Sequence, residues 1–121
     1  MKIQESAEDY LEAILMLRHS GITVRPTDIA QYLNFSKPSV SRALSLLTEN
    51  GYVEPQRDEG VLLTEAGEAI AQKMYERHRF FSDWLVSLGV SEQVAMQDAC
   101  RLEHDLSEQT FQKIREYIEK H

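Results

Sequence analysis

Hydrophobic positions recur every three or four residues along most of the chain, a spacing typical of amphipathic helices. The first such stretch follows a capping serine, Ser6. A second stretch covers residues 27–33, and a third runs from the capping Ser36 to Asn50. Residues 34–36 separate these two stretches and are typical of a tight turn. The pattern therefore predicts three helices in the first fifty residues, the last two joined by a short turn.

The pattern then changes to short apolar runs. Two of them, residues 52–54 and 61–63, flank a turn at residues 58–60, which predicts a small β-hairpin. Beyond it the helical spacing returns, with a long fourth helix that runs to about Leu88. Each helix predicted after the hairpin begins at a capping hydroxyl: Thr64, Ser91 and Ser107.

The order of these elements predicts the fold class. Two helices joined by a tight turn and followed by a β-hairpin are typical of a winged helix-turn-helix. We therefore expect a mainly α-helical protein in two domains. Residues 1–72 would form a winged helix-turn-helix DNA-binding domain, and residues 73–121 a second, all-helical domain.

The second predicted domain carries more apolar surface than so small a helical unit can bury alone. This surface consists of Phe80, Phe81, Trp84, Leu85, Leu88, Phe111, Ile114, Tyr117 and Ile118. The alternative is that these side chains close a monomeric core. A reader of two successive major grooves needs two reading heads, so we expect a homodimer.

One face of the third helix suits an approach to double-stranded DNA. Its apolar stripe, formed by Val40, Ala43, Leu44 and Leu47, must pack inward. The opposite face carries small hydroxyls and one arginine, which favour contacts with phosphates and base edges. The predicted DNA-binding residues are Arg25, Lys37, Pro38, Ser39, Ser41, Arg42, Ser45 and Arg57. A winged helix that binds only protein is the alternative.

The net charge of the chain argues against binding to DNA. Its 121 residues include 13 Lys and Arg against 20 Asp and Glu, a net charge of −7, whereas affinity for DNA comes largely from basic residues. Residues 24–63, however, hold four basic against five acidic side chains, so most of the excess acid lies outside the predicted reading unit. The composition, 42% hydrophobic and 27% charged, is ordinary for a globular protein and excludes a chain that is disordered throughout.

The chain contains no apolar run of about 18 residues, and its N-terminus reaches acidic residues at once. We therefore expect neither a membrane span nor a signal peptide. The one cysteine, Cys100, cannot form an internal disulfide, which fits a reducing compartment. These features predict a cytoplasmic protein whose thiol is available for packing, redox chemistry or metal binding.

A second group of chemically active residues lies in the last third of the chain. Cys100, Glu103 and His104 have helical spacing and share one face of a helix. Sulfur, oxygen and nitrogen donors together can coordinate a first-row transition metal. Three more donors could come from other helices: Asp9, Glu12 and His78.

Each of these donors also has a purely structural explanation. Asp9 can close a capping box, Glu12 and Glu103 can be solvated helix charges, His78 can pair with an acid, and Cys100 can be a small core residue. The sequence alone leaves open whether the three helices meet. As a set, the spacings favour a metal site over unrelated surface charges.

Several motifs in order resemble the metal-dependent transcriptional repressors of the diphtheria-toxin-repressor and manganese-transport-regulator family, over nearly the whole chain. The motifs are SAEDYLE at 6–12, the helix-turn-helix at 28–40, LTEAG at 63–67, Arg77-His78 and CRLEHDLS at 100–107. The resemblance implies that the family's metal-ligand positions are Asp9, Glu12, His78, Cys100, Glu103 and His104.

The match combines features of two branches of that family. By the resemblance, Asp9 belongs to the manganese branch and Cys100 to the iron branch, whereas two further ligand positions of the iron branch are here Ser82 and Met96. A thiolate favours Fe(II), Co(II) or Zn(II), and carboxylates favour Mn(II). We expect Fe(II) or Mn(II) as the cofactor, with Zn(II) as the alternative.

These observations together predict a metal-responsive transcriptional repressor. A divalent metal bound between the two domains would fix the dimer geometry for operator DNA, and the regulated genes would serve metal homeostasis. One alternative is a metal-independent regulator that binds a small organic ligand, as the MarR group does; others are a protein-binding adaptor and a metal-dependent enzyme. Because no nucleophile motif or phosphate-binding loop accompanies the cluster, we do not expect an enzyme.

Overall fold

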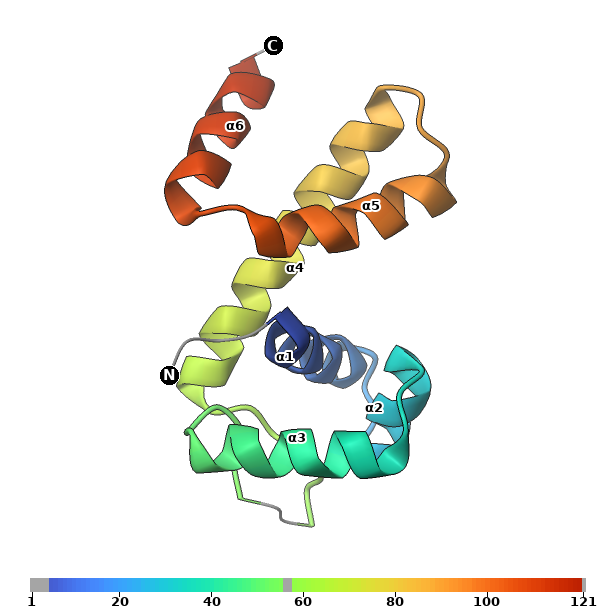
Figure 1. The fold of residues 1–121 in the computed structure, drawn as a ribbon, viewed down its shortest axis with the longest axis vertical. Helices are drawn as coiled ribbons and strands as arrows, with labels where there is room; N and C mark the ends of the chain where they lie inside the picture. Colours follow the sequence, from blue (N-terminus) through green and yellow to red (C-terminus); the bar gives the residue numbers. More distant parts are fainter. Residues whose placement is uncertain (1–4, 56–57, 121) are drawn as a thin grey trace. The chain divides into compact units, whose positions relative to one another are not determined.

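Six helices make up most of the residues that the computed structural model describes, which are 5–55 and 58–120 (Figure 1). The helices are α1 (Glu5–His19), α2 (Pro26–Leu33), α3 (Lys37–Glu49), α4 (Glu65–Ser87), α5 (Glu92–Asp105) and α6 (Glu108–Lys120). The chain divides into two compact units, unit 1 at residues 1–73 and unit 2 at residues 74–121. The mainly α-helical class predicted from the sequence is confirmed.

In unit 1 the first three helices pack against one another around an aliphatic core. Leu11 and Ile14 of α1, Ile29 of α2 and Val40 of α3 are fully buried. They occupy the apolar positions of the helical pattern, and burying each such side chain contributes about 1.5–3 kcal/mol. The apolar stripe of α3 therefore faces inward, as predicted, and its opposite face is left for other contacts.

The turn between α2 and α3 has the geometry that its sequence predicts. Asn34 adopts a left-handed conformation, with φ 59° and ψ 44°, and its N–H donates to the carbonyl of Ala30. Ser36 precedes α3 in an extended conformation, and its hydroxyl accepts a hydrogen bond from the N–H of Ser39 at 3.3 Å. This capped turn sets the direction in which α3 leaves α2.

The predicted β-hairpin is shorter than expected. Val53 and Leu63 form an isolated antiparallel bridge, and no strand extends beyond it among the residues that the structure describes. Pro55 has no N–H with which to continue a ladder. The N–H of Val61 donates at 2.8 Å to the carbonyl of Val24, which lies before α2 and not in the facing residues 52–54. The described part of the wing is therefore a loop closed by the Val53–Leu63 bridge and tied to the segment before α2.

A threonine and a glycine attach the start of α4 to the base of this wing. The hydroxyl of Thr64 donates to the carbonyl of Gly51 at 2.6 Å and accepts from the N–H of Gly67 at 3.1 Å. Gly67 lies so close to the carbonyl of Tyr52 that a Cβ atom would clash with it. The LTEAG motif thus has a structural role, which is to cap α4 and to admit the wing backbone beside it.

Unit 2 contains the remainder of α4 together with α5 and α6. Phe81, Ala99 and Phe111, one from each helix, form its buried core. The rings of Phe81 and Phe111 have centroids 5.7 Å apart, and the ring of Phe80 lies edge-on to both, at 5.5 and 5.6 Å. Within 5–55 and 58–120, no helix combines the length and apolar character that a membrane crossing requires.

Candidate metal centre and DNA-reading helix

α3 presents the predicted reading face to solvent. Its exposed residues from the predicted set are Lys37, Pro38, Ser41, Arg42 and Ser45. Ser39 is half-buried and connects two neighbours: its hydroxyl accepts from the hydroxyl of Ser36 at 2.8 Å and from Nη2 of Arg42 at 3.5 Å. A chain of side-chain contacts therefore runs from the helix cap to the one arginine of this face.

A second predicted DNA contact, Arg25, lies just before α2. Its backbone N–H donates to the carboxylate of Asp28 at 2.8 Å, and its guanidinium donates to the carbonyl of Asp58 at 3.4 Å. Arg25 is exposed and is held beside the wing loop. The other predicted wing contact, Arg57, lies outside the described residues.

Tyr10 of α1 contacts the turn between α2 and α3. It is 6% exposed, and its ring meets that of Phe35 edge-on with centroids 5.6 Å apart. Burial raises the pKa of Tyr10 above its usual value, and the positive charge of Arg42 lowers that pKa in part. The phenol is thus neutral and lies close enough to Arg42 to feel its positive charge.

Two of the six predicted metal ligands belong to unit 1. Asp9 and Glu12 are half-buried on α1, three residues apart and on one face of that helix. Their neighbour Tyr10 faces the core. α1 therefore contributes to the hydrophobic core with one face and displays two carboxylates on another.

The other four predicted ligands belong to unit 2, where α4 and α5 bring them together. Cys100, Glu103 and His104 each offer one donor atom, and these three atoms lie within 4.8 Å of one another. Nδ1 of His78 lies 3.0 Å from Oε2 of Glu103, and Nε2 of His104 lies 3.4 Å from Oε1. Glu103 is fully buried and lies at the centre of the cluster, whereas Cys100 is exposed at its edge.

The chemistry of this donor set fits a first-row divalent metal. Zinc–nitrogen and zinc–sulfur bonds of about 2.1 and 2.3 Å place two donors on one ion no more than about 4.4 Å apart, and the donor atoms of Cys100, Glu103 and His104 lie within 4.8 Å of one another. An ionised Glu103 would accept a hydrogen bond from the Nδ1–H of His78, and that tautomer would leave the Nε2 lone pair for a metal. A buried carboxylate beside two imidazoles and a thiol is costly unless charge is supplied to it.

A residue whose role the sequence did not predict, Arg77, adjoins this cluster. It is 2% exposed, and its Nη1 donates to the carbonyls of Glu103 at 3.0 Å and Leu106 at 2.7 Å. Its Nη2 donates to the carboxylate of Glu108 at 3.1 Å, and the guanidinium lies over the ring of Phe111. The one signal in the sequence was its position directly before His78.

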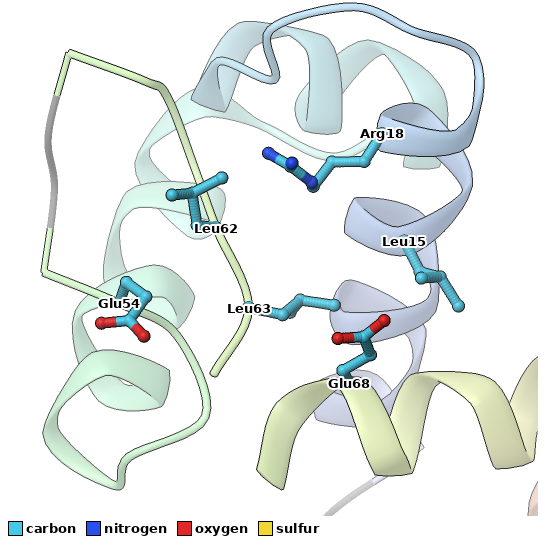
Figure 2. A pocket seen from close by; sticks show the side chains of 6 residues that line it. All are labelled: Leu15, Arg18, Glu54, Leu62, Leu63 and Glu68. Carbon is cyan, nitrogen blue, oxygen red and sulfur yellow. The ribbon is translucent and has the colours of Figure 1, made fainter. Parts of the chain in front are cut away.

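Unit 1 also contains a pocket with a charged rim (Figure 2). It is lined by Leu15, Arg18, Glu54, Leu62, Leu63 and Glu68. Figure 2 shows the side chain of Leu63 pointing into the space between Arg18 of α1 and Glu68 of α4, with Glu54 of the wing base on the other side of the Leu63 backbone. No predicted ligand or DNA contact lines this pocket, so it belongs to neither predicted site.

Unit 2 carries an apolar groove. Its lining residues are Phe81, Trp84, Ser87, Leu88, Leu102, Leu106, Lys113, Ile114, Tyr117 and Ile118. Leu88 is 63% exposed and Tyr117 66% exposed. Most of the groove consists of residues predicted for dimerisation, and contiguous exposed apolar side chains are a feature of protein interfaces.

Comparison with known families decides what these two units are. Residues 2–61 match the N-terminal DNA-binding domain of the iron-dependent repressors, and residues 64–121 match their metal-binding and dimerisation domain. The chain belongs to the iron-dependent repressor family. This is the group of metal-dependent transcriptional repressors that its motifs resemble, so the predicted family membership is confirmed.

Individual relatives support the same family membership. It is 37% identical to the transcriptional regulator MntR of Escherichia coli over 98% of its own length and 76% of the relative. It is 33% identical to an uncharacterised helix-turn-helix transcriptional regulator of Methanocaldococcus jannaschii, over 98% of the chain and 96% of the relative. A solved manganese-dependent transcriptional repressor in complex with manganese has 30% identity and a TM-score of 0.80, over 89% of this chain and 50% of that one.

The comparisons also bear on the alternatives. These relatives are described as transcriptional regulators, and one domain of the family is described as metal-binding. A metal-independent regulator of the MarR type is therefore not favoured for this repressor. Both the DNA-reading and the metal-binding hypotheses agree with the family.

Proposed function

We propose that this repressor binds operator DNA as a homodimer when a divalent metal occupies a centre formed by six side chains. The proposed ligands are Asp9, Glu12, His78, Cys100, Glu103 and His104. The observation that carries the proposal is that donor atoms of Cys100 and His104 lie beside the buried carboxylate of Glu103 in unit 2. Residues 1–72 would then be the DNA-binding domain and residues 73–121 the domain for dimerisation and metal binding.

Electrostatics explain why the six side chains could act as a switch. Three carboxylates and a thiolate repel one another while no positive charge balances them. A bound divalent ion would supply that charge together with fixed coordination directions. Asp9 and Glu12 would then be held with the ligands of unit 2, and one arrangement of the two units would be favoured over others.

The reading face of α3 is proposed to enter the major groove. Arg42 has the chemistry to donate to a guanine edge, and Lys37 and Arg25 have the charge to contact phosphates. Two copies of α3 must lie about 34 Å apart to enter successive major grooves, which requires a dimer of fixed geometry. The apolar groove of unit 2 is the surface we assign to that dimer.

We infer that Fe(II) or Mn(II) is the metal, with Zn(II) as the alternative. Soft sulfur from Cys100 favours Fe(II) or Zn(II), whereas the carboxylates of Asp9, Glu12 and Glu103 favour Mn(II). We assign no catalytic activity to the chain, because its relatives are transcriptional regulators. Genes that maintain metal homeostasis are the proposed targets.

A gel-shift experiment tests the proposal. The chain is titrated onto the promoter of its own gene or of a metal-transporter gene, with a chelator or with Mn(II), Fe(II) or Zn(II), the iron samples being kept anaerobic. We expect the shift to need metal, with Fe(II) or Mn(II) effective at the lowest concentration. Equal binding in the chelator and metal lanes would contradict the metal switch. Linkage adds that operator DNA should tighten metal binding by the same factor.

A further inference from the structure

Arg77 is the most deeply buried charged residue on α4, and its guanidinium hydrogen bonds reach α5 and α6 within unit 2. It directly precedes His78, and these two successive side chains contact the same residue of α5, Glu103. His78 meets the carboxylate of Glu103 at 3.0 Å, and Arg77 donates to the backbone carbonyl of Glu103 at 3.0 Å. Glu103 is therefore held at both its side chain and its backbone from one turn of α4.

The end of α5 explains why a buried arginine is useful at this point. The last carbonyls of a helix have no partner within the helix, and they carry a partial negative charge. Arg77 donates to two of these terminal carbonyls, those of Glu103 and Leu106. Its planar guanidinium can serve both carbonyls at once, which a lysine ammonium on a flexible stem does less well. The last turn of α5, which carries Glu103 and His104, is thereby fixed against α4.

The same guanidinium also reaches α6. Its Nη2 donates to the carboxylate of Glu108 in the first turn of α6 at 3.1 Å, and its Cζ lies 5.0 Å from the centre of the Phe111 ring. Phe111 belongs to the buried core of unit 2. Arg77 therefore joins the turn that carries the metal donors to the helix that lines the apolar groove.

We propose that Arg77 is a positioning residue of the metal centre, which holds Glu103 and His104 in the arrangement that a metal ion needs. The proposal rests on the proposed function, because it assumes that these side chains are ligands. Groups that orient metal ligands typically change metal affinity by about 10- to 100-fold when they are removed. A merely structural arginine would instead change the stability of unit 2 and leave the coordination of a bound metal as it was.

Co(II) titration of the full chain tests this proposal. Co(II) is used because its visible absorption reports the geometry and the ligands of the site, independently of DNA binding. We expect Arg77→Met to lower the Co(II) affinity at least tenfold and to alter the absorption spectrum of the bound ion. Arg77→Lys, which keeps the charge and the stem, should recover part of the affinity. The matched control is Arg79→Met on the exposed side of α4, which should bind Co(II) like the wild type.

Circular dichroism of each metal-free variant shows whether it is folded. If Arg77→Met is unfolded, Arg77→Lys carries the test, and an affinity and spectrum equal to those of the wild type would overturn the proposal. The same result in a folded Arg77→Met would overturn it as well. If the wild type itself does not bind Co(II), both this proposal and the proposed metal centre fail, whereas wild-type binding with unaltered Arg77 variants refutes the positioning role alone.

Discussion

Unit 1 and unit 2 each use an arginine near their candidate functional residues, but in opposite environments. Arg42 of unit 1 is exposed on α3, and its guanidinium contacts the hydroxyl of Ser39, three residues away in the sequence. Arg77 of unit 2 is buried and donates to carbonyls that follow it by 26 and 29 residues. An exposed guanidinium keeps its donors for an external partner, whereas the buried one uses them to fix its own chain.

The acidic residues of the two units differ in the same way. Glu49 and Asp58 of unit 1 are exposed, where a carboxylate retains its hydration. Glu103 of unit 2 is 0% exposed, and a buried carboxylate lowers the stability of a fold unless it is compensated. These two exposed carboxylates of unit 1 are hydrated, whereas Glu103 of unit 2 is compensated by the imidazoles of His78 at 3.0 Å and His104 at 3.4 Å. Both imidazoles belong to proposed metal ligands, so the buried carboxylate lies where we propose that a metal ion binds.

Replacing Glu103 with glutamine should have the largest effect on function. Glutamine keeps the shape of the side chain but removes the negative charge and the stronger ligand, so we expect metal affinity to fall by at least about 100-fold, the upper end of the losses seen when groups that only orient ligands are removed. Metal-dependent DNA binding should be lost with it. Competition with a chromophoric chelator measures the affinity.

The stability of the metal-free Glu103→Gln variant sharpens the comparison between the units. Because the amide oxygen of glutamine can still accept the hydrogen bond from His78 while a buried charge is removed, urea unfolding should show a chain at least as stable as the wild type. The control is Glu116→Gln, whose carboxylate is 58% exposed on α6 and should change neither quantity. A Glu103→Gln variant that is destabilised and still binds metal would mean that the buried carboxylate is a structural group.

Replacing Arg42 with alanine should have the next largest effect, confined to unit 1. The loss of a base-edge contact costs about 1–3 kcal/mol of binding free energy, so we expect roughly 10- to 100-fold weaker binding to the preferred operator. Lys37→Ala is the matched comparison, because loss of a phosphate contact should weaken binding to all sequences alike and lower its salt dependence. Fluorescence anisotropy with specific and unrelated duplexes separates the two.

Metal affinity and dimerisation should be unchanged in Arg42→Ala, since the arginine is exposed on α3. Equal losses on specific and unrelated DNA would assign Arg42 to the phosphate backbone instead of to a base. A loss of metal affinity would show that the reading helix and the metal centre are linked more directly than we propose.

Features that depend on neighbours in the sequence were predictable. The left-handed Asn34 and the capping Ser36 follow from local backbone preferences, and the outward face of α3 follows from its apolar stripe. The shared face of Cys100, Glu103 and His104 follows from helical spacing alone. Each of these predictions needs no knowledge of the tertiary structure.

Features that depend on distant partners were not predictable. The role of Arg77 is set by two carbonyls in another helix, and carbonyls carry no signature of residue type. The wing was predicted as two strands from its apolar runs, yet Pro55 interrupts the ladder and Val61 bonds elsewhere. In both cases tertiary hydrogen bonding decided the outcome. Helix caps lie between these extremes, because their residues are local but their effects can extend to a functional face.

Replacing Ser36 with alanine should have the smallest effect and the most informative one for this comparison. Its hydroxyl accepts the N–H of Ser39 at 3.3 Å and donates to the hydroxyl of Ser39 at 2.8 Å, which in turn contacts Arg42. Loss of an N-cap typically costs about 1 kcal/mol of stability, measurable by urea unfolding. Ser91→Ala is the matched change in unit 2, where the hydroxyl accepts the N–H of Val94 at 3.4 Å. Both variants should lose similar stability, but only Ser36→Ala should also weaken operator binding under conditions in which both proteins are fully folded; equal operator binding by the two would show that the contacts between Ser36, Ser39 and Arg42 do not orient the reading arginine.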